Sequence, residues 1–343
     1  MKECKSMLIY FAGIMLLFAV LLGPCVQSSV RAAEFELKYG ALNPETLYMA
    51  KIAKSWMAKI EKDSNGRVHF TPYWGGTLLT PSDAPEEIAR GVVDVGNFSA
   101  DYPKVGFDII KSSGTFWYGI TIAGQTKTIV GLHKKYPALD NELAKYGKML
   151  GHNAMAPMQL MTKKPVRKLT DLKGMKIKAT PAYVPLLREL GAEAVMMSMF
   201  ECYLALQKGI IDGILSPLDS LVPLKFVEIV KSITMLNLTY APQPGPVISL
   251  KAWTKLPPDI QKVFENNAKF YDDENLRIVT EVNNEMIVAA KKAGIKFVEL
   301  SPQDTKKIDE ILYKESQRKA AELEAKNLPG KAILQDVRRA AGK

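Results

Sequence analysis

Cysteine is scarce in this chain of 343 residues, which contains only three. Cys4 and Cys25 lie within the first 32 residues, so loss of that segment leaves Cys202 alone. A single cysteine forms no intramolecular disulfide, and stability then depends on the hydrophobic core. Since no histidine is near Cys202 in the sequence, we expect a buried, unreactive thiol rather than a nucleophile.

The motifs of the common enzyme classes are also missing. His69, His133 and His152 are far apart, and no H-E-x-x-H, paired Cys/His, G-x-S-x-G or P-loop spacing occurs. Glu201 and Asp212 are the strongest carboxylate candidates, but Glu201 fits a helix cap and Asp212 a turn. We therefore predict no catalytic residue, no cofactor and no metal site, and keep an exported enzyme as the weakest alternative.

Long apolar runs are limited to Met7–Leu22, which is shorter than the roughly 20 residues of a membrane-spanning helix. A basic segment precedes this run and Val30-Arg31-Ala32 follows it, which is typical of a cleaved signal peptide. We predict that residues 1–32 are a signal peptide and that the chain is exported, in preference to an N-terminal membrane anchor.

Positive charge exceeds negative charge, with 46 Lys and Arg against 36 Asp and Glu and a formal net charge of +10. Cleavage after residue 32 lowers the net charge to +8, because the segment carries Lys2, Lys5 and Arg31 against Glu3. A basic surface attracts anions, but the charges are not clustered with aromatic residues as nucleic acid binding requires. We expect no nucleic acid partner.

Strand and helix patterns alternate along the chain. In the first part, strands are expected at 35–40, 68–73 and 92–98 and helices at 45–60 and 85–90. Residues 99–125 lack periodicity and are expected to form surface loops, followed by helices at 126–133 and 138–146 and an extended segment at 149–161. Later strands are expected at 232–240, 247–250 and 295–300, and a helix at 302–326.

The segment 163–217 predicts a strand-helix-strand-helix-strand unit. A helical turn at 170–172 ends at Gly174, a strand follows at 175–179, and Pro181 fits the start of a helix. Ser198 and Glu201 have the S-x-x-E spacing of a capping box, and the helix that they begin ends at Gly209 before a strand at 210–215. Such units form parallel sheets whose strand ends open onto a crevice.

A long helix is indicated at 258–293, since residues 259–293 contain neither Gly nor Pro and keep a helical apolar stripe. One continuous helix would be about 50 Å long and would exceed the width of one lobe. Two helices broken near Asp272 and Asp273 fit the sequence equally well.

The order of several motifs resembles that of the DctP-type solute-binding proteins of TRAP transporters, the tripartite ATP-independent periplasmic carriers of organic acids. In chain order these motifs are DSNGRVHFTPY (63–73), EEIARGVVDVG (86–96), KKPV (163–166), DLKGMKIK (171–178), ELGA (189–192), ECYLALQKGIIDG (201–213), Pro217 and KLPPDIQKVF (255–264). The resemblance implies a two-lobed, periplasmic-binding-protein-like α/β fold with a long helix that spans both lobes. It places lobe I at 33–156 plus about 244–283, and lobe II at 157–243 plus about 284–335.

The resemblance also implies a ligand site. In the family an arginine stands at the end of the strand after the DLKG motif and another is often present earlier, where this chain has Lys178 and Met158. A lysine binds a carboxylate as a point charge with fewer fixed donors than a guanidinium, and methionine offers only apolar contact. The other implied site residues are Phe98, Ser99, Tyr102, Pro181, Phe200 and Ser216, which Trp74, Trp117 and Tyr118 are expected to join from loops.

An apolar and aromatic site with one cation predicts a monocarboxylate with an apolar or aromatic body as the ligand. The resemblance implies a monomeric periplasmic protein that closes on this ligand and delivers it to the membrane subunits of a TRAP carrier. A periplasmic sensor or scavenging protein on the same fold remains the alternative.

Overall fold

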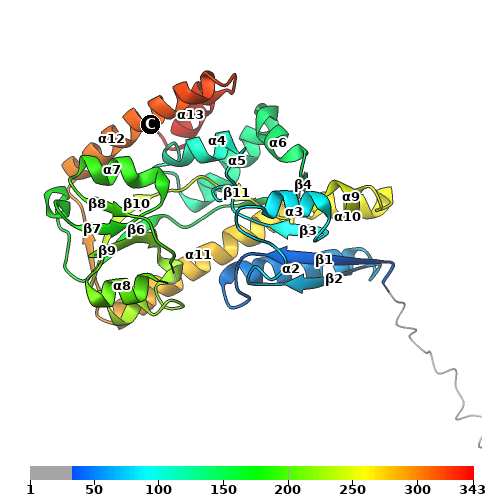
Figure 1. Ribbon diagram of the computed structural model, residues 1–343, viewed down its shortest axis with the longest axis horizontal. Helices are drawn as coiled ribbons and strands as arrows, with labels where there is room; N and C mark the ends of the chain where they lie inside the picture. The colour runs from blue at the N-terminus through cyan, green and yellow to red at the C-terminus, as the bar shows by residue number, and fades with distance from the viewer. Residues whose placement is uncertain (1–32, 200) are drawn as a thin grey trace, which may run out of the picture. The chain divides into compact units, whose positions relative to one another are not determined.

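The structure is a computed structural model that describes residues 33–199 and 201–343 (Figure 1). The predicted signal peptide, residues 1–32, and Phe200 lie outside the described residues. Glu34–Lys343 form one compact unit, which contains two larger β-sheets and a two-stranded ribbon. Within the described ranges, no helix combines the length and the apolar character needed to cross a membrane.

The first sheet consists, in spatial order, of β2 (Val68–Tyr73), β1 (Phe35–Ala41), β3 (Val95–Asn97), β12 (Val247–Ser249) and β4 (Gly147–Met149). β1 pairs in parallel with both β2 and β3, as strand-helix-strand connections require. Helix α2 (Tyr48–Asp63) packs on this sheet because Ile52, Trp56 and Ile60 recur every four residues and are fully buried.

The second sheet consists, in spatial order, of β13 (Lys296–Glu299), β10 (Ser232–Leu238), β6 (Met158–Thr162), β9 (Gly213–Pro217), β7 (Lys176–Lys178) and β8 (Glu193–Val195). β7 pairs in parallel with β8 and β9, which confirms the parallel arrangement predicted for 163–217. Helix α7 (Val184–Glu189) contributes Leu187 to the core on one face of this sheet, and α8 (Cys202–Lys208) contributes Leu206 to the core on the other.

The glycine signals in 163–217 act as expected, while the last strand of the unit lies at 213–217 and not at 210–215 as predicted. The 3-10 helix η2 (Leu169–Leu172) is followed by Gly174 at φ +76°, and α8 ends at Gly209 at φ +73°, conformations that favour glycine. The Glu201 carboxylate accepts a hydrogen bond from the Ser198 backbone N–H at 3.0 Å, which is one half of the predicted capping box. The N-cap of α8, however, is Glu201 and not Ser198 as predicted. Asp212 Oδ2 accepts a hydrogen bond from the Lys176 backbone N–H at 2.8 Å, so the role of Asp212 is structural.

The chain crosses between the two sheets three times. β5 (His152–Asn153) lies on the first crossing and β11 (Gln243–Pro244) on the second, and they pair antiparallel. The third crossing is helix α11 (Ala268–Lys292). It supplies Tyr271 and Ile278 to the core beside the first sheet and Ala290 to the core beside the second.

The long helix is divided at a residue that neither prediction named. Helix α10 (Pro258–Asn266) is separated from α11 by one residue, Asn267. The Asn267 side-chain amide donates to Val263 O and to Asp63 Oδ2, each at 2.9 Å, which fixes the junction against α2. Asp272, where a break was considered, lies inside α11.

The prediction of surface loops at 99–125 is wrong. This segment contains α4 (Asp108–Ser112) and the 3-10 helix η1 (Ser113–Thr115), and it buries Phe107, Phe116 and Trp117 in one core. These aromatic side chains fill the core from irregular backbone, so helical periodicity did not reveal them. The other helical elements are α5 (Ile122–Lys135), α6 (Pro137–Ala144), α9 (Leu250–Trp253), α12 (Pro302–Glu324), α13 (Gly330–Ala340), α3 (Ala84–Arg90), η3 (Pro181–Tyr183), η4 (Leu218–Ser220) and η5 (Phe226–Glu228).

Candidate functional site

Lys178 ends β7 and is the buried cation of the second sheet. Its side chain is only 8% exposed, yet within the described part of the chain it makes neither an ion pair nor a hydrogen bond. Burial lowers the pKa of Lys178, and the nearby Cys202 thiol opposes this effect. A desolvated ammonium without a counter-charge is costly, so this position is suited to an anionic ligand.

The register of the strands places two further polar side chains on the face of Lys178. Lys178 is paired with Ile214, and Ser216 lies two residues further along β9 on the same face. Ser216 is in turn paired with Gln159 of β6. Lys178, Ser216 and Gln159 therefore form a polar row near the carboxyl ends of β7 and β9, where open α/β sheets bind ligands.

Gln159 was not predicted as a site residue, and its orientation is fixed by neighbouring groups. Its Nε2 donates to Asn237 Oδ1 at 2.8 Å and its Oε1 accepts from the Asn237 N–H at 2.9 Å. The Ser216 hydroxyl lies 3.3 Å from the Ser220 hydroxyl. Gln159 is a polar side chain between the apolar residues Met158 and Leu160 of β6, a signal that could have identified it.

Met158, the residue that was predicted on β6, lies on the opposite face of the sheet. Adjacent strand residues point to opposite sides, and Met158 is buried in the core with Leu160 and Ile177. The structure therefore does not bring Met158 to the face of Lys178.

The residues predicted after β3 have three different environments. Phe98 is 3% exposed and packs edge-on against Phe107 at 5.6 Å, so it belongs to the core. Ser99 is half-buried, with its hydroxyl 3.1 Å from Asp101 Oδ2 and 3.2 Å from Gln243 Oε1. Tyr102 is 61% exposed. Ser99 and Tyr102 remain accessible to a ligand.

Asp101 is a carboxylate in the same loop that sequence reasoning did not single out. Burial raises its pKa, and hydrogen bonds from Tyr240 and Ser99 act in the opposite direction. Tyr240 follows β10 of the second sheet, so this pair joins segments that belong to the two sheets. The contact is a structural link between them beside Ser99.

The tryptophan residues that were predicted to join the ligand site, Trp74 and Trp117, do not line a common surface. Trp117 is 2% exposed and lies in the core, which corrects the expectation that it faces the crevice from a loop. Trp74 is half-buried against Tyr39, with ring centroids 5.5 Å apart. Pro181 is exposed at the start of η3 and lines a cavity of about 190 Å³.

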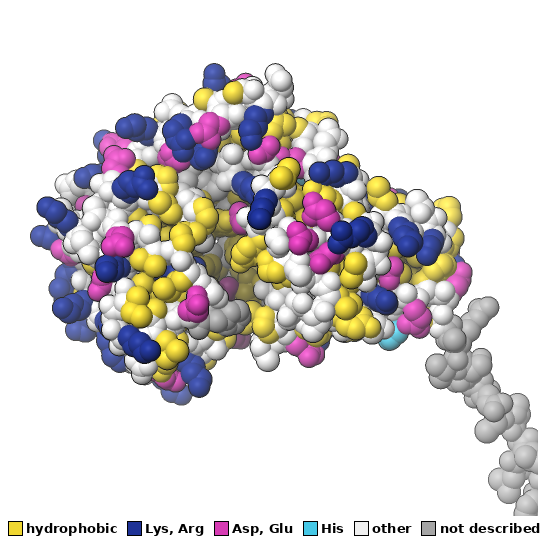
Figure 2. Space-filling view, viewed as in Figure 1, with side chains coloured by type: hydrophobic (Ala, Val, Ile, Leu, Met, Phe, Trp, Pro, Cys, Tyr) yellow, Lys and Arg dark blue, Asp and Glu magenta, His cyan; other side chains and the backbone are white. Residues whose placement is uncertain are grey.

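A hollow in the molecular surface lies between the two parts of the molecule. Figure 2 shows it between the part that holds β7, β9 and α8 and the part that holds α3 and β3, with apolar side chains on its rim. Ligands of two-sheet α/β proteins commonly enter between the sheets, at the carboxyl ends of the strands. This hollow is the candidate entrance to the row of Lys178, Ser216 and Gln159.

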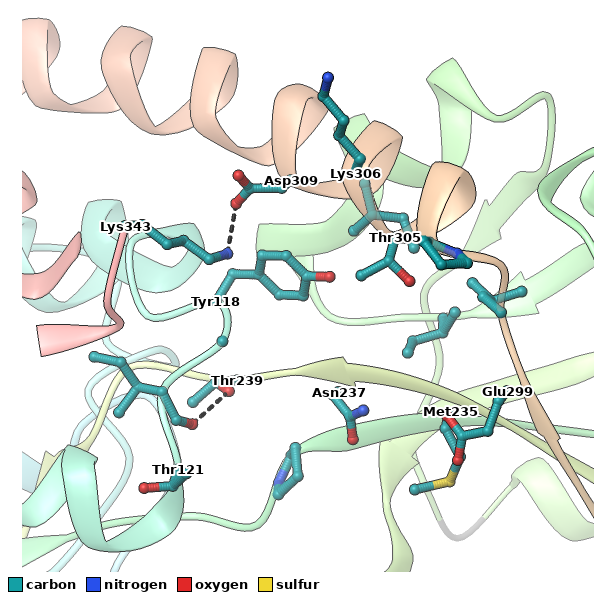
Figure 3. Close-up of a pocket in the computed structure, with 17 residues that line it drawn as sticks. Tyr118, Thr121, Met235, Asn237, Thr239, Glu299, Thr305, Lys306, Asp309 and Lys343 are labelled. Carbon is teal, nitrogen blue, oxygen red and sulfur yellow. Dashed lines mark hydrogen bonds and ion pairs between the residues drawn. The ribbon is translucent and has the colours of Figure 1, made fainter. Parts of the chain in front are cut away.

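A second concave region, a cavity of about 800 Å³, lies beside the carboxyl ends of β10 and β13 (Figure 3). Its Lys343 ammonium is 2.5 Å from Asp309 and lies over the Tyr118 ring at 4.0 Å. Asn237 and Glu299 lie at its other end. Of the described residues expected at the site, only Tyr118 lines this cavity. The cavity's Lys343 is already paired with Asp309, so Lys178 marks the better candidate.

Two of the three histidines meet in space although they are far apart in the sequence. The ring centroids of His133 and His152 are 4.8 Å apart. The Nδ1 atom of His133 lies 2.6 Å from Asp140 Oδ1, and that of His152 lies 3.3 Å from Asp272 Oδ1. In residues 33–199 and 201–343, no group of three or more His, Cys, Asp or Glu side chains is placed to hold a metal ion.

The chain is similar to known proteins over most of its length. The model of the bacterial extracellular solute-binding protein family 7 matches residues 39–322. A monocarboxylate 2-oxoacid-binding periplasmic protein of Nostoc sp. is 22% identical over 292 residues, which is 78% of this chain and 76% of the relative.

Solved structures of solute-binding proteins are similar to this chain in fold. A TRAP periplasmic solute-binding protein from Desulfovibrio salexigens has a TM-score of 0.81 and 28% identity, covering 90% of this chain and 96% of its own. A TRAP solute-binding protein from Rhodoferax ferrireducens, solved with copurified benzoate, has a TM-score of 0.78 and 20% identity, covering 90% and 97%. The predicted two-lobed α/β fold is thereby confirmed.

Proposed function

The chain belongs to the bacterial extracellular solute-binding protein family 7, and we propose that it captures a small monocarboxylate with an apolar or aromatic body. Members of this family are binding proteins of transport systems and not enzymes, which agrees with the prediction that this chain has no catalytic role. The ligand would enter the hollow of Figure 2 and contact both sheets.

The observation that carries this proposal is the buried Lys178, which has no ion-pair or hydrogen-bond partner among the residues that the structure describes. A ligand carboxylate supplies a negative charge to this largely buried ammonium, where a charge-assisted hydrogen bond is strong. Ser216 offers a hydroxyl group on the same face. Lys178 is the one charged member of its row, so a single carboxylate balances it.

The ligands named for similar proteins support the same chemical class. The Nostoc relative is named for monocarboxylate 2-oxoacids, and the Rhodoferax structure contains benzoate. Both compounds carry one carboxylate on a small organic body. Apolar side chains on the rim of the hollow suit such a body.

The proposed cycle begins with binding to the second sheet through Lys178 and Ser216. Ser99 and Tyr102 reach the ligand from the first sheet when the two lobes, 33–156 plus about 244–283 and 157–243 plus about 284–335, close on it. The closed form then docks on the membrane subunits of a TRAP carrier. We place the mature protein in the periplasm as a monomer, after removal of residues 1–32.

Calorimetry with benzoate, mandelate, pyruvate and succinate tests the proposal. We expect the aromatic monocarboxylates to bind the wild-type protein, and Lys178→Met to weaken this binding by roughly thirtyfold or more because the carboxylate loses its partner. Lys176→Met is the matched control, since Lys176 lies on the same strand but is exposed. Equal binding by Lys178→Met, or a preference for succinate, would contradict the proposal.

A further inference from the structure

We propose that capture of a carboxylate by this chain is coupled to the uptake of a proton by Lys178, so that the affinity falls at alkaline pH. The inference rests on the proposed function and adds a regulation that follows from the lysine itself. A guanidinium at this position stays protonated throughout the accessible pH range and gives no such coupling.

The described groups around Lys178 provide no negative charge. β9 presents Ile214 and β8 presents Val195 in register with Lys178, and both are uncharged. On α8 the ionisable group beside Lys178 is the Cys202 thiol, which is fully buried, while Glu201 next to it is exposed. Within the described residues no carboxylate lies within ion-pair distance of the Lys178 ammonium.

Burial without a counter-charge favours the neutral amine, and it lowers the pKa of Lys178 in the free protein. A bound carboxylate reverses this balance, because an ion pair at the same position favours the ammonium. The pKa of Lys178 is therefore higher in the complex than in the free protein. Between the two values the reaction consumes one proton from solvent, which forms the third N–H bond of the ammonium beside the ligand carboxylate.

The sign of the pH dependence follows from this difference. Below the pKa of the free protein, Lys178 is already charged and the affinity does not depend on its proton. Above that pKa, protonation must accompany binding, so the association constant falls by up to about tenfold for each pH unit. The dependence ends above the pKa of the complex, where neither form is protonated.

The first arm of the test needs no ligand. In the wild-type protein with ¹³C-labelled lysine side chains, the Lys178 Cε resonance, assigned by its loss in Lys178→Arg, is followed by NMR from pH 7 to 11. We expect it to titrate at lower pH than the resonances of exposed lysines such as Lys176. Titration together with the exposed lysines would overturn the inference, whatever the protein binds.

The second arm measures proton uptake directly. Benzoate is titrated calorimetrically at pH 7 to 10 in buffers of different ionisation enthalpy, with circular dichroism to show that each variant is folded. We expect uptake of up to one proton in the wild type and none in Lys178→Arg, whose affinity stays constant. Tight binding without uptake, or the same uptake in Lys178→Arg, overturns the coupling but leaves the proposed function intact. If the wild-type protein binds no carboxylate at pH 7 although its Lys178 resonance titrates at lower pH than the exposed lysines, the proposed function is contradicted instead.

Discussion

Lys178 combines two properties that oppose each other at the scale of the residue. Its burial without a partner among the described residues lowers the stability of the free protein, and the same burial strengthens its attraction for a carboxylate. Such trade-offs between stability and function are common at binding sites. The position therefore makes predictions for stability as well as for binding.

Replacement of Lys178 by methionine is expected to raise the free energy of unfolding by about 1 kcal/mol at pH 7, because an unpaired buried cation becomes an apolar side chain of similar length. Urea denaturation at equilibrium measures this change. Lys176→Met, at an exposed position, should stay within about 0.5 kcal/mol of the wild type. A clear loss of stability in Lys178→Met would show that the ammonium is satisfied in the free protein.

Glu142 on α6 predicts a pH dependence of stability. Its Oε1 accepts from the Ile109 N–H at 3.0 Å, while its Oε2 is buried without a partner among the described residues. Burial raises the pKa of Glu142 from 4.5 to about 6, and the Ile109 N–H acts in the opposite direction. The folded protein thus holds the proton more tightly than the unfolded chain, so this contribution to stability is present at low pH and is lost as the pH rises through about 6.

Glu142→Gln should remove that dependence, since glutamine does not titrate. The difference in the free energy of unfolding between variant and wild type is expected to shift in favour of the variant by about 2 kcal/mol between pH 4 and pH 8. Denaturation curves at several pH values give this difference. The exposed Glu285→Gln is the control, and a difference for Glu142→Gln that does not change with pH would refute the assignment.

At the scale of the element, the strand pairs decide which side chains meet. The pairing of β7 with β9 and of β9 with β6 aligns Lys178, Ser216 and Gln159, although they come from three separate segments. A close contact between two 3-10 helices, η1 and η3, likewise joins separate segments of the chain. Gly114 of η1 approaches Ala182 so closely that a Cβ at position 114 would lie 2.9 Å from the Ala182 Cβ.

Gly114→Ala is therefore expected to destabilise the protein by about 1–3 kcal/mol, because the added methyl group forces η1 and η3 apart. Gly131→Ala on α5 is the matched control, since a Cβ there meets no atom within 4 Å. That control should gain about 0.5–1 kcal/mol from helix propensity. Thermal denaturation compares the two variants.

The double variant Gly114→Ala with Ala182→Gly identifies the cause. Removal of the Ala182 methyl group should restore most of the lost stability if the close contact is responsible. Additive losses in the double variant would mean that the backbone at Gly114, and not its contact with η3, is sensitive.

At the scale of the whole molecule, α11 and the crossing strands tie the two sheets together. The Tyr271 hydroxyl of α11 donates to Asn153 of β5 at 2.7 Å and accepts from Asn97 of β3 at 3.2 Å. Asp272 accepts from the His152 N–H at 2.6 Å. The first half of α11 is thus fixed to the first sheet, while its second half packs with the second. The closure that we propose would therefore bend the chain at these crossings.

Ligand binding is expected to make the protein more compact. Small-angle X-ray scattering of the wild type should show a smaller radius of gyration with saturating benzoate than without it, as in hinge closure. Lys178→Met should show no change at the same concentration, because it does not retain the ligand. Calorimetric binding of benzoate with an unchanged radius of gyration would contradict closure.

Local signals in the sequence were sufficient where the structure depends on neighbours along the chain. The strand at 68–73 has the predicted boundaries, and the turns at Gly174 and Gly209 adopt the left-handed conformation that favours glycine. The order of the motifs also indicated the family and with it the two-lobed fold. The resemblance also predicted Lys178 as a site residue at the end of a strand, and Lys178 is the last residue of β7.

Tertiary structure alone decided the environment of each side chain. The alternation along β6 gives two faces, but only its pairing with β9 shows that Gln159, and not Met158, lies on the face of Lys178. The burial of Trp117 likewise depends on distant residues that complete its core. The absence of a partner for Lys178 among the described residues is a property of the assembled fold, because a counter-charge can come from any part of the chain.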